Sequence, residues 1–298
     1  MNFTGQVKAA ALENGADLVG FGPISRFDGL PPELNPKGIM PQARTVITVG
    51  LVFYRGSLKT VEEGTYWISY NFDSNYYLND IEGPRVLRMT ARCLEQNGYT
   101  ALPLDNLMLG GARAARKTRP EHPVHPDMQV PYDILAVGCG LGEIGRGGRL
   151  LTPEYGPRQR VYCLLTDAEL EATPLFKGGI CDGCGDCIAG CRACAIGEEA
   201  RVVLEADGQQ YRAPYFDEKK CEYERMGRDA KHSPFISGEE KISELPPPFY
   251  KYLRKNALHA DFCCGRGCVT SCLDHLEKTG RIGSSFKLPL IKQERWEL

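Results

Sequence analysis

The sequence predicts an α+β protein followed by a cysteine-rich part, and three observations support this. Strand-like and helix-like segments alternate over the first 170 residues, which is typical of mixed folds. Only three of the thirteen cysteines lie in that region, whereas the other ten fall between residues 181 and 272. A break containing a proline, at residues 171–177, separates the two parts. We therefore expect domains at residues 1–172 and 173–280, with a tail at 281–298.

Two segments of the first part have the pattern of helices. Residues 4–14 read as a helix with Thr4 as its N-cap and Gly15 as its stop. Residues 84–97 form an amphipathic pattern with a proline in the first turn, and a glycine follows the last residue. We expect both to pack an apolar face against a sheet.

Three apolar runs in the same part have the pattern of strands. Residues 17–21, 45–53 and 161–166 are short, and the second is rich in β-branched side chains. Such runs are typical of buried strands. The alternation of strands and helices therefore predicts an α/β or α+β domain.

The composition is that of a globular protein with reduced thiols. Hydrophobic residues make up 42% of the 298 residues, charged residues 25%, and the formal net charge is −2. This balance gives no reason to expect a nucleic-acid or membrane partner. The start of the chain has no basic segment followed by an apolar one, and no apolar run is long enough to span a membrane. We expect a cytoplasmic protein, in which clustered cysteines indicate metal rather than disulfides.

The first cysteine cluster has the spacing of bacterial ferredoxins. Cys181, Cys184, Cys187 and Cys191 give C-x2-C-x2-C-x3-C, in which the fourth cysteine ligates the other of two [4Fe–4S] clusters. Three thiolates two residues apart can converge on one cluster from a single loop. Arg192 stands where that pattern has a proline.

Two clusters need eight ligands, and later cysteines complete the set. The crossover arrangement assigns Cys272 to the first cluster and gives the second cluster one ligand from the first motif. The choice between Cys263 and Cys264 stays open, with the shorter spacing favouring Cys264. Structural zinc commonly uses two separated ligand pairs, so the triple run favours clusters over zinc. The predicted ligands are Cys181, Cys184, Cys187 and Cys272 for the first cluster, and Cys191, Cys221, Cys264 and Cys268 for the second.

A glycine motif in the first part resembles a dinucleotide site but lacks its context. Gly140, Gly142 and Gly145 form G-x-G-x-x-G, and Asp167 follows about twenty residues later. Residues 146–160 contain two prolines and three glycines, so no crossover helix fits there. The glycines instead indicate close approach of the backbone to a flat ligand or to another segment of the chain.

These residues resemble those of a known family. The chain is similar to epoxyqueuosine reductase and, more remotely, to the reductive dehalogenases, which are corrinoid-dependent iron–sulfur reductases. The likeness covers roughly residues 8–275 and is most specific at the cysteines. It is carried by ENGADLVGFGPISRF at 13–27, CGLGEIGR at 139–146, LLTPEYGPRQR at 150–160, LLTDAEL at 164–170 and the cysteine pattern.

The resemblance implies a fold and a set of cofactors. The first domain would be nitroreductase-like, of the B12-processing type, and would bind corrinoid and substrate. The second would be a bacterial ferredoxin-like domain with two [4Fe–4S] clusters, fed by an external ferredoxin or flavodoxin. Cobalamin would lie between the two domains. The positions that match the corrinoid surroundings are Gly140, Gly142, Gly145, Arg146 and Thr152.

The sequence departs from the family pattern around the proton donor. Epoxyqueuosine reductase has an aspartic acid in a D-S-x-P context, whereas residues 122–133 read HPVHPDMQVPYD. Asp127 stands near the expected place, with Tyr132 and His125 as rival donors. An aspartic acid needs burial to remain protonated at neutral pH.

A second departure concerns the substrate. The last cysteines are spaced C-x3-C-x3-C, and the chain lacks the C-terminal repeat extension of tRNA-acting members. We therefore expect an oxidoreductase that acts on a small organic substrate through clusters and corrinoid. The alternatives are an electron-transfer protein that activates a separate corrinoid protein, or a reductase containing flavin.

Overall fold

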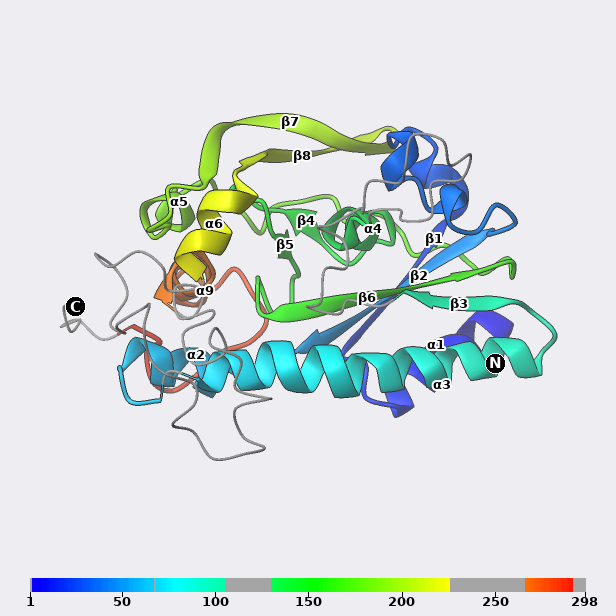
Figure 1. Cartoon of the computed structure of the whole chain (residues 1–298), viewed down its shortest axis with the longest axis horizontal. Coiled ribbons are helices and arrows are strands. Elements are labelled where there is room, and N and C mark those ends of the chain that lie inside the picture. Colours follow the sequence, from blue (N-terminus) through cyan, green and yellow to red (C-terminus); the bar gives the residue numbers. More distant parts are fainter. Residues whose placement is uncertain (1, 67, 105–129, 226–265, 292–298) are drawn as a thin grey trace, which may run out of the picture.

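The centre of the structure is a four-stranded antiparallel sheet. The structure, a computed structural model, describes residues 2–66, 68–104, 130–225 and 266–291. The strand order is β1-β2-β6-β3, with every neighbouring pair antiparallel (Figure 1). The sheet confirms the three predicted strands and adds a fourth. Its strands are β1 (Leu18–Pro23), β2 (Thr45–Val52), β6 (Gln159–Thr166) and β3 (Ala101–Leu104).

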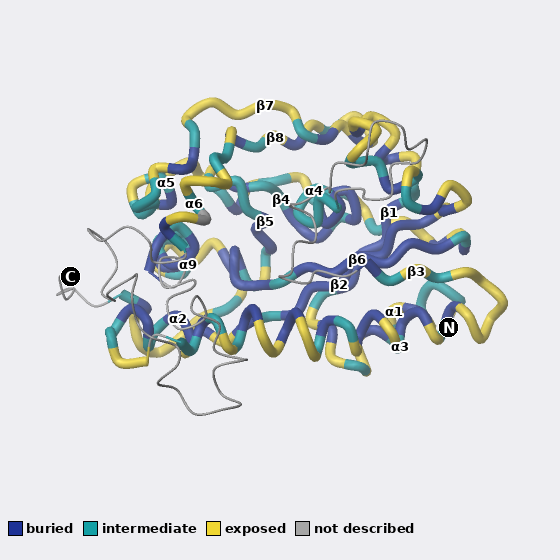
Figure 2. Tube along the Cα trace, in the orientation of Figure 1, coloured by how far each residue is buried: buried dark blue, intermediate teal, exposed yellow. Residues whose placement is uncertain are grey.

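The sheet is buried on both faces because its strands carry apolar residues at successive positions. Side chains alternate between the faces of a strand. In β2, Ile47 and Val49 belong to one hydrophobic core and Val46 to the other. Helices α1 (Phe3–Glu13) and α3 (Gly83–Gln96) cover the first face, and α4 (Tyr132–Gly138) covers the second (Figures 1 and 2). This is the mixed arrangement of helices and sheet that the sequence pattern predicted.

The ends of α1 and α3 follow local rules, with one correction. The N-cap of α1 is Asn2, whose side-chain oxygen accepts from the backbone N–H of Gly5 at 2.8 Å. The prediction of Thr4 as the cap was therefore wrong. The Thr4 hydroxyl instead accepts from the backbone N–H of Glu171 at 2.9 Å. Gly98, beyond the end of α3, has φ of +84°, the left-handed conformation that favours glycine.

A π-helix, Asn71–Glu82, leads directly into α3. Polar contacts with β6 fix its inner face. Arg160 donates to the Asn75 side chain at 2.6 Å, and the Tyr162 hydroxyl donates to the Asn79 side chain at 2.9 Å. Helix α2 (Arg55–Glu62) precedes it. A π-helix is rare and is defined by its i→i+5 hydrogen bonds, so an apolar pattern in the sequence does not predict it.

A long hairpin separates the first cysteine run from Cys221. Its strands, β7 (Ile196–Ala206) and β8 (Gln209–Phe216), lie over α4 and place Leu204 in the second core (Figure 1). Arg26 holds the turn of the hairpin, because its guanidinium donates to Asp207 at 2.8 Å and to two backbone carbonyls at 2.9 Å.

The remaining helices gather at one end of the sheet (Figure 1). There α5 (Asp186–Ala189) and α6 (Glu218–Arg225) lie near α9 (Cys268–Lys278). Leu273 and Leu276 of α9 are buried in the first core. Ile282 and Leu290, from the predicted tail, are buried with them, so this part of the tail packs against the body of the protein.

Candidate metal centre

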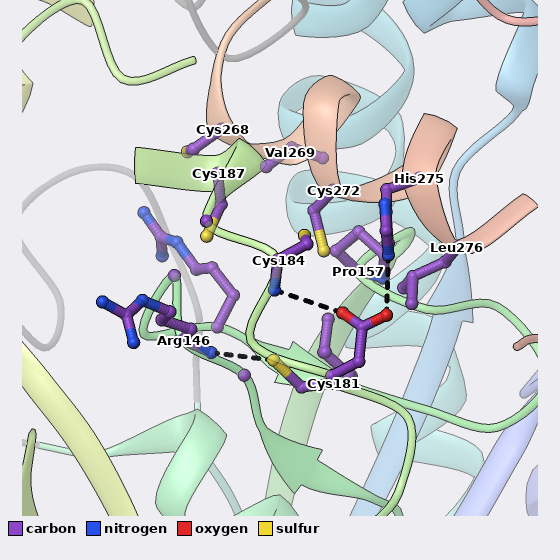
Figure 3. A pocket seen from close by; sticks show the side chains of 16 residues that line it. Arg146, Pro157, Cys181, Cys184, Cys187, Cys268, Val269, Cys272, His275 and Leu276 are labelled. Carbon is purple, nitrogen blue, oxygen red and sulfur yellow. Dashed lines mark hydrogen bonds and ion pairs between the residues drawn. The ribbon is translucent and has the colours of Figure 1, made fainter. Parts of the chain in front are cut away.

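The first cysteine motif forms a loop that turns around a cavity. Gly183 and Gly185 have φ of +76° and +89°, and they alternate with the cysteines. Because only glycine adopts this conformation at low cost, the loop can reverse direction between one thiol and the next. Cys184 lies between these two glycines. Helix α9 closes the cavity from the opposite side (Figure 3).

Five thiols line this cavity. Cys181, Cys184 and Cys187 come from the loop, whereas Cys268 and Cys272 come from successive turns of α9. The four thiols predicted for the first cluster therefore converge on one space. The rest of the lining is largely apolar or backbone and includes Gly145, Gly147, Leu151, Pro157, Val269 and Leu276.

The glycine-rich stretch supplies the wall opposite α9. The backbone N–H of Arg146 donates to the Cys181 sulfur at 3.3 Å (Figure 3). A Cβ on Gly147 would lie 3.1 Å from the Cys187 Cβ, so this wall approaches the loop closely. Backbone N–H donors to sulfur are one of the features that set the potential of iron–sulfur clusters.

The neighbouring thiols affect one another's pKa values. Burial raises the pKa of the Cys272 thiol well above its usual range, and the neighbouring cysteines raise it further. Burial also raises the pKa of Cys187, again with contributions from Cys181 and Cys184. Four thiolates in so small a space repel one another unless cations neutralise them. The donor set therefore suits a positively charged metal group that binds sulfur.

A carboxylate from the glycine-rich stretch holds the start of the loop. Glu143, in the short strand β4 (Glu143–Ile144), accepts from the backbone N–H of Gly179 at 3.0 Å and from that of Cys181. Strand β4 pairs with β5 (Leu150–Leu151). Sequence reasoning did not single out Glu143, because a glutamate inside a glycine motif carries no signal of this contact.

The residues predicted for the second cluster are less completely described. Cys191 and Cys221 are half-buried and do not line the cavity, and Cys263 and Cys264 lie outside the described residues. The Cys191 sulfur accepts from the backbone N–H of Ala195 at 3.4 Å. Cys194, which follows the first cysteine motif, is exposed.

The other cysteines lie away from the cavity. Cys139 and Cys163 are fully buried in the second core, and burial raises the pKa of Cys139 to about 12. Cys93 is half-buried against the first core. Their core positions keep these three thiols out of the cavity.

Two of the glycines matched to corrinoid contacts pack against the chain itself. A Cβ on Gly140 would lie 2.4 Å from the Pro174 carbonyl oxygen, and one on Gly142 would lie 1.9 Å from that of Leu151. The close approach expected from the glycine motif is therefore made here to other segments of the chain. The segment before Gly140 is helix α4 and not a strand, which agrees with the rejection of a dinucleotide site.

The other three matched positions divide into two groups. Gly145 and Arg146 line the thiol cavity. Thr152 is fully buried, and its hydroxyl donates to the Gln159 side chain at 3.2 Å.

Of the predicted proton donors, the structure describes Tyr132. Asp127 and its rival His125 fall outside the described residues. Tyr132 begins α4, is half-buried, and packs beside the second core. It does not line the thiol cavity.

The protein is therefore a mixed α/β fold in which thiols from two distant segments converge on one cavity. No family model matches the chain. Over 98 residues it is 37% identical to a tetrachloroethene reductive dehalogenase from Desulfitobacterium hafniense, a match that covers 31% of this chain and 18% of that protein. The chain thus spans less than a fifth of the length of the curated relatives it matches.

Two solved structures have a similar fold. A reductive dehalogenase, described with a mechanism for B12-dependent dehalogenation, has a TM-score of 0.55 at 19% identity, over 96% of this chain and 38% of that one. Epoxyqueuosine reductase from Bacillus subtilis has a TM-score of 0.51 at 12% identity, over 94% of this chain and 84% of that one. The chain is therefore similar in fold to these two proteins, and over 98 residues similar in sequence to a reductive dehalogenase, which confirms the resemblance that its motifs indicated. Within the described ranges, no helix has the length and apolarity to cross a bilayer.

Proposed function

We propose that this chain is an iron–sulfur reductase. In this proposal, electrons from an external ferredoxin or flavodoxin pass through two [4Fe–4S] clusters to a corrinoid, and a small organic substrate is reduced. The observation that carries the proposal is the convergence of Cys181, Cys184, Cys187 and Cys272 on one cavity. The similarity to a tetrachloroethene reductive dehalogenase supports reduction of an organic substrate.

The residues at the cavity fit the first cluster. Four thiols, an apolar wall and a backbone donor to the Cys181 sulfur are the environment that such a cluster needs. Cys268, one turn before Cys272 on α9, would serve the second cluster. Its other ligands would be Cys191, Cys221 and Cys264.

In this proposal, the two kinds of cofactor bind to different parts of the chain. Residues 173–280 would form the ferredoxin-like domain, and residues 1–172 the nitroreductase-like domain for corrinoid and substrate. Gly145 and Arg146 line the cavity of the first cluster, so they would hold the corrinoid beside that cluster. Gly140, Gly142 and Thr152 would support this wall by packing. When bound, a corrinoid supplies a cobalt centre that can be reduced and can then reduce an organic molecule.

A proton must accompany reduction of the substrate, and Asp127 and Tyr132 are the proposed donors. Tyr132 is the first residue of α4, and its hydroxyl group could donate the proton. Replacing the true donor, by Asp127→Asn or Tyr132→Phe, should abolish turnover while leaving the cluster EPR signals intact. A variant with unchanged turnover would remove that residue from the proposal.

Metal analysis after anaerobic reconstitution tests the proposal. The chain would be incubated with ferrous iron, sulfide and hydroxocobalamin and then desalted. We expect about eight irons and one cobalt per chain, with the EPR of reduced [4Fe–4S] clusters. Zinc in place of iron would refute the cluster assignment. Iron without retained cobalt would refute the corrinoid part.

One observation favours a second function, that of an electron-transfer protein for a separate corrinoid protein. The chain itself fills the space beside Gly140 and Gly142. Under this alternative, cobalamin would not stay on the chain, and reduction of an added corrinoid protein would accelerate. A yellow chromophore retained on purification would instead indicate a flavin in the nitroreductase-like domain.

A further inference from the structure

The Asp182 carboxylate connects the cysteine loop to helix α9. Asp182 lies between two of the loop cysteines, and its Oδ1 accepts from the backbone N–H of Cys184 at 3.2 Å. Its Oδ2 lies 2.9 Å from the His275 Nε2 (Figure 3) and 3.1 Å from the Arg281 Nε. His275 is on α9 and lines the cavity, and Arg281 follows that helix. The amide of Cys184 is thus held, through Asp182, by two basic side chains from α9 and the segment after it.

The same two basic side chains reach the loop at further points. The His275 Nδ1 lies 3.3 Å from the Asp186 Oδ2, at the start of α5. Arg281 donates from Nη1 to the Gly179 carbonyl at 3.1 Å. The loop is therefore fixed to the α9 side before, within and after the segment that carries Cys184.

Cys184 depends on these contacts more than the other thiols do. It is exposed, whereas Cys187 is buried and Cys272 is half-buried. A Cβ on either flanking glycine, Gly183 or Gly185, would meet nothing within 4 Å, so no packing holds the loop on that side. Cys181 has a separate anchor in Glu143.

We propose that Asp182 and His275 form a positioning latch that holds Cys184 as a cluster ligand. This inference rests on the proposed [4Fe–4S] cluster at Cys181, Cys184, Cys187 and Cys272. The latch acts through Cys184 and does not itself bind iron. It keeps the sulfur of the most exposed ligand directed into the cavity, so that the iron bound to it is retained.

Loss of the latch should release one iron in particular. When a mild one-electron oxidant such as ferricyanide oxidises a [4Fe–4S]²⁺ cluster, the electron passes to ferricyanide. Fe²⁺ then leaves, and [3Fe–4S]⁺ remains. The iron that leaves gives up its bonds to three sulfides and to one thiolate, and the iron lost is the one whose thiolate is least firmly held. Without His275, this is the iron bound to Cys184, and the Cys184 sulfur is then exposed to water.

The test compares the reconstituted full chain with three variants. His275→Ala removes both latch contacts on the ring, and His275→Gln keeps an N–H donor that can reach one carboxylate. Lys278→Ala is the matched control, because Lys278 lies on the same helix and, within the described residues, forms its ion pair with Asp274 at 2.6 Å and not with the cysteine loop. After brief treatment with ferricyanide, bound iron and the EPR signal of [3Fe–4S]⁺ are measured.

We expect His275→Ala to form [3Fe–4S]⁺ roughly 10-fold faster than the parent, as is typical when a partner of a metal ligand is lost. His275→Gln should lie between the two, and Lys278→Ala should match the parent. Equal rates in the parent and His275→Ala would overturn the latch. Should His275→Ala fail to fold, Asp182→Ala, which removes a surface carboxylate, tests the same prediction. A parent chain that binds no cluster would refute the proposed function instead.

Discussion

Glu277, near the end of α9, forms a buried ion pair with Arg55 of α2. Their side chains are 11% and 7% exposed, and two Arg55 nitrogens donate to the carboxylate at 2.8 Å. Arg55 also donates to the Leu288 carbonyl and lies over the Phe286 ring. Glu277→Ala leaves the guanidinium buried without its carboxylate. We therefore expect a large loss of stability and weaker packing of the helix that carries Cys268 and Cys272.

The neighbouring Arg158 sets the size of this loss. Burial lowers the pKa of Arg158, and Glu277 counteracts this, whereas Arg55 adds to it. Removing Glu277 leaves the buried Arg55 guanidinium without its carboxylate, and it takes away a negative charge that also acts on Arg158. Breaking a buried pair by removal of one partner costs about 3–5 kcal/mol, and the second guanidinium argues for the upper half of that range.

Urea denaturation followed by circular dichroism measures this loss. Lys278→Ala removes a largely exposed ammonium group from the same helix and leaves Asp274 its backbone donor at Ile291, so it should cost about 0–1 kcal/mol. Replacing both partners by apolar residues, Arg55→Met with Glu277→Leu, should recover most of the stability, because no charge is then left buried. A loss for Glu277→Ala no larger than that of the control would refute the reasoning and show that water reaches the pair.

Three further predictions concern the core and the hairpin. The Cys139 thiol has a pKa of about 12 against an ordinary 9.0, so its neutral form stabilises the fold fully below pH 9 and this contribution is lost as the pH rises toward 12. Cys139→Ala should therefore lose less stability than the parent over that interval in urea denaturation, and parallel curves would contradict this. Gly142→Ala places a Cβ against the Leu151 carbonyl and should cost about 1–3 kcal/mol. The control Gly29→Ala meets nothing within 4 Å and should cost far less; equal costs would exclude the clash as the cause. Arg26→Met leaves two carbonyls without their donor, at roughly 1–3 kcal/mol each if both are cut off from water. Limited proteolysis should then cleave the β7–β8 hairpin faster, and an unchanged cleavage rate would show that Arg26 does not secure it.

The elements that could be predicted are those whose local pattern agrees with their place in the fold. β2 and β6 are continuous apolar runs because both of their faces are covered, and α3 has a single apolar face. The π-helix, Asn71–Glu82, could not be found this way. Its inner face is polar, and Arg160 and Tyr162 of a distant strand hold it. The hairpin strand β7 also escaped prediction, since five successive residues of it are exposed.

The candidate site could likewise be predicted only in part from the sequence. Cysteine spacing is a strong local signal, and the crossover arrangement further predicted that Cys272 would join Cys181, Cys184 and Cys187 in one cavity. The residues that hold the loop carry no such signal. His275 and Asp182 are 93 positions apart, and only the tertiary structure shows that they touch.

The two walls of the thiol cavity are synthesised at different times, because they come from distant parts of the chain. Its thiols come from a loop near residue 185 and from a helix near residue 270, so during synthesis three of them emerge long before the other two. A site that exists only after distant segments have met cannot guide the early steps of folding. The newly made chain must first dock α9 on the sheet. Until then, the three loop thiols are more accessible to oxidants than they are once α9 has closed the cavity.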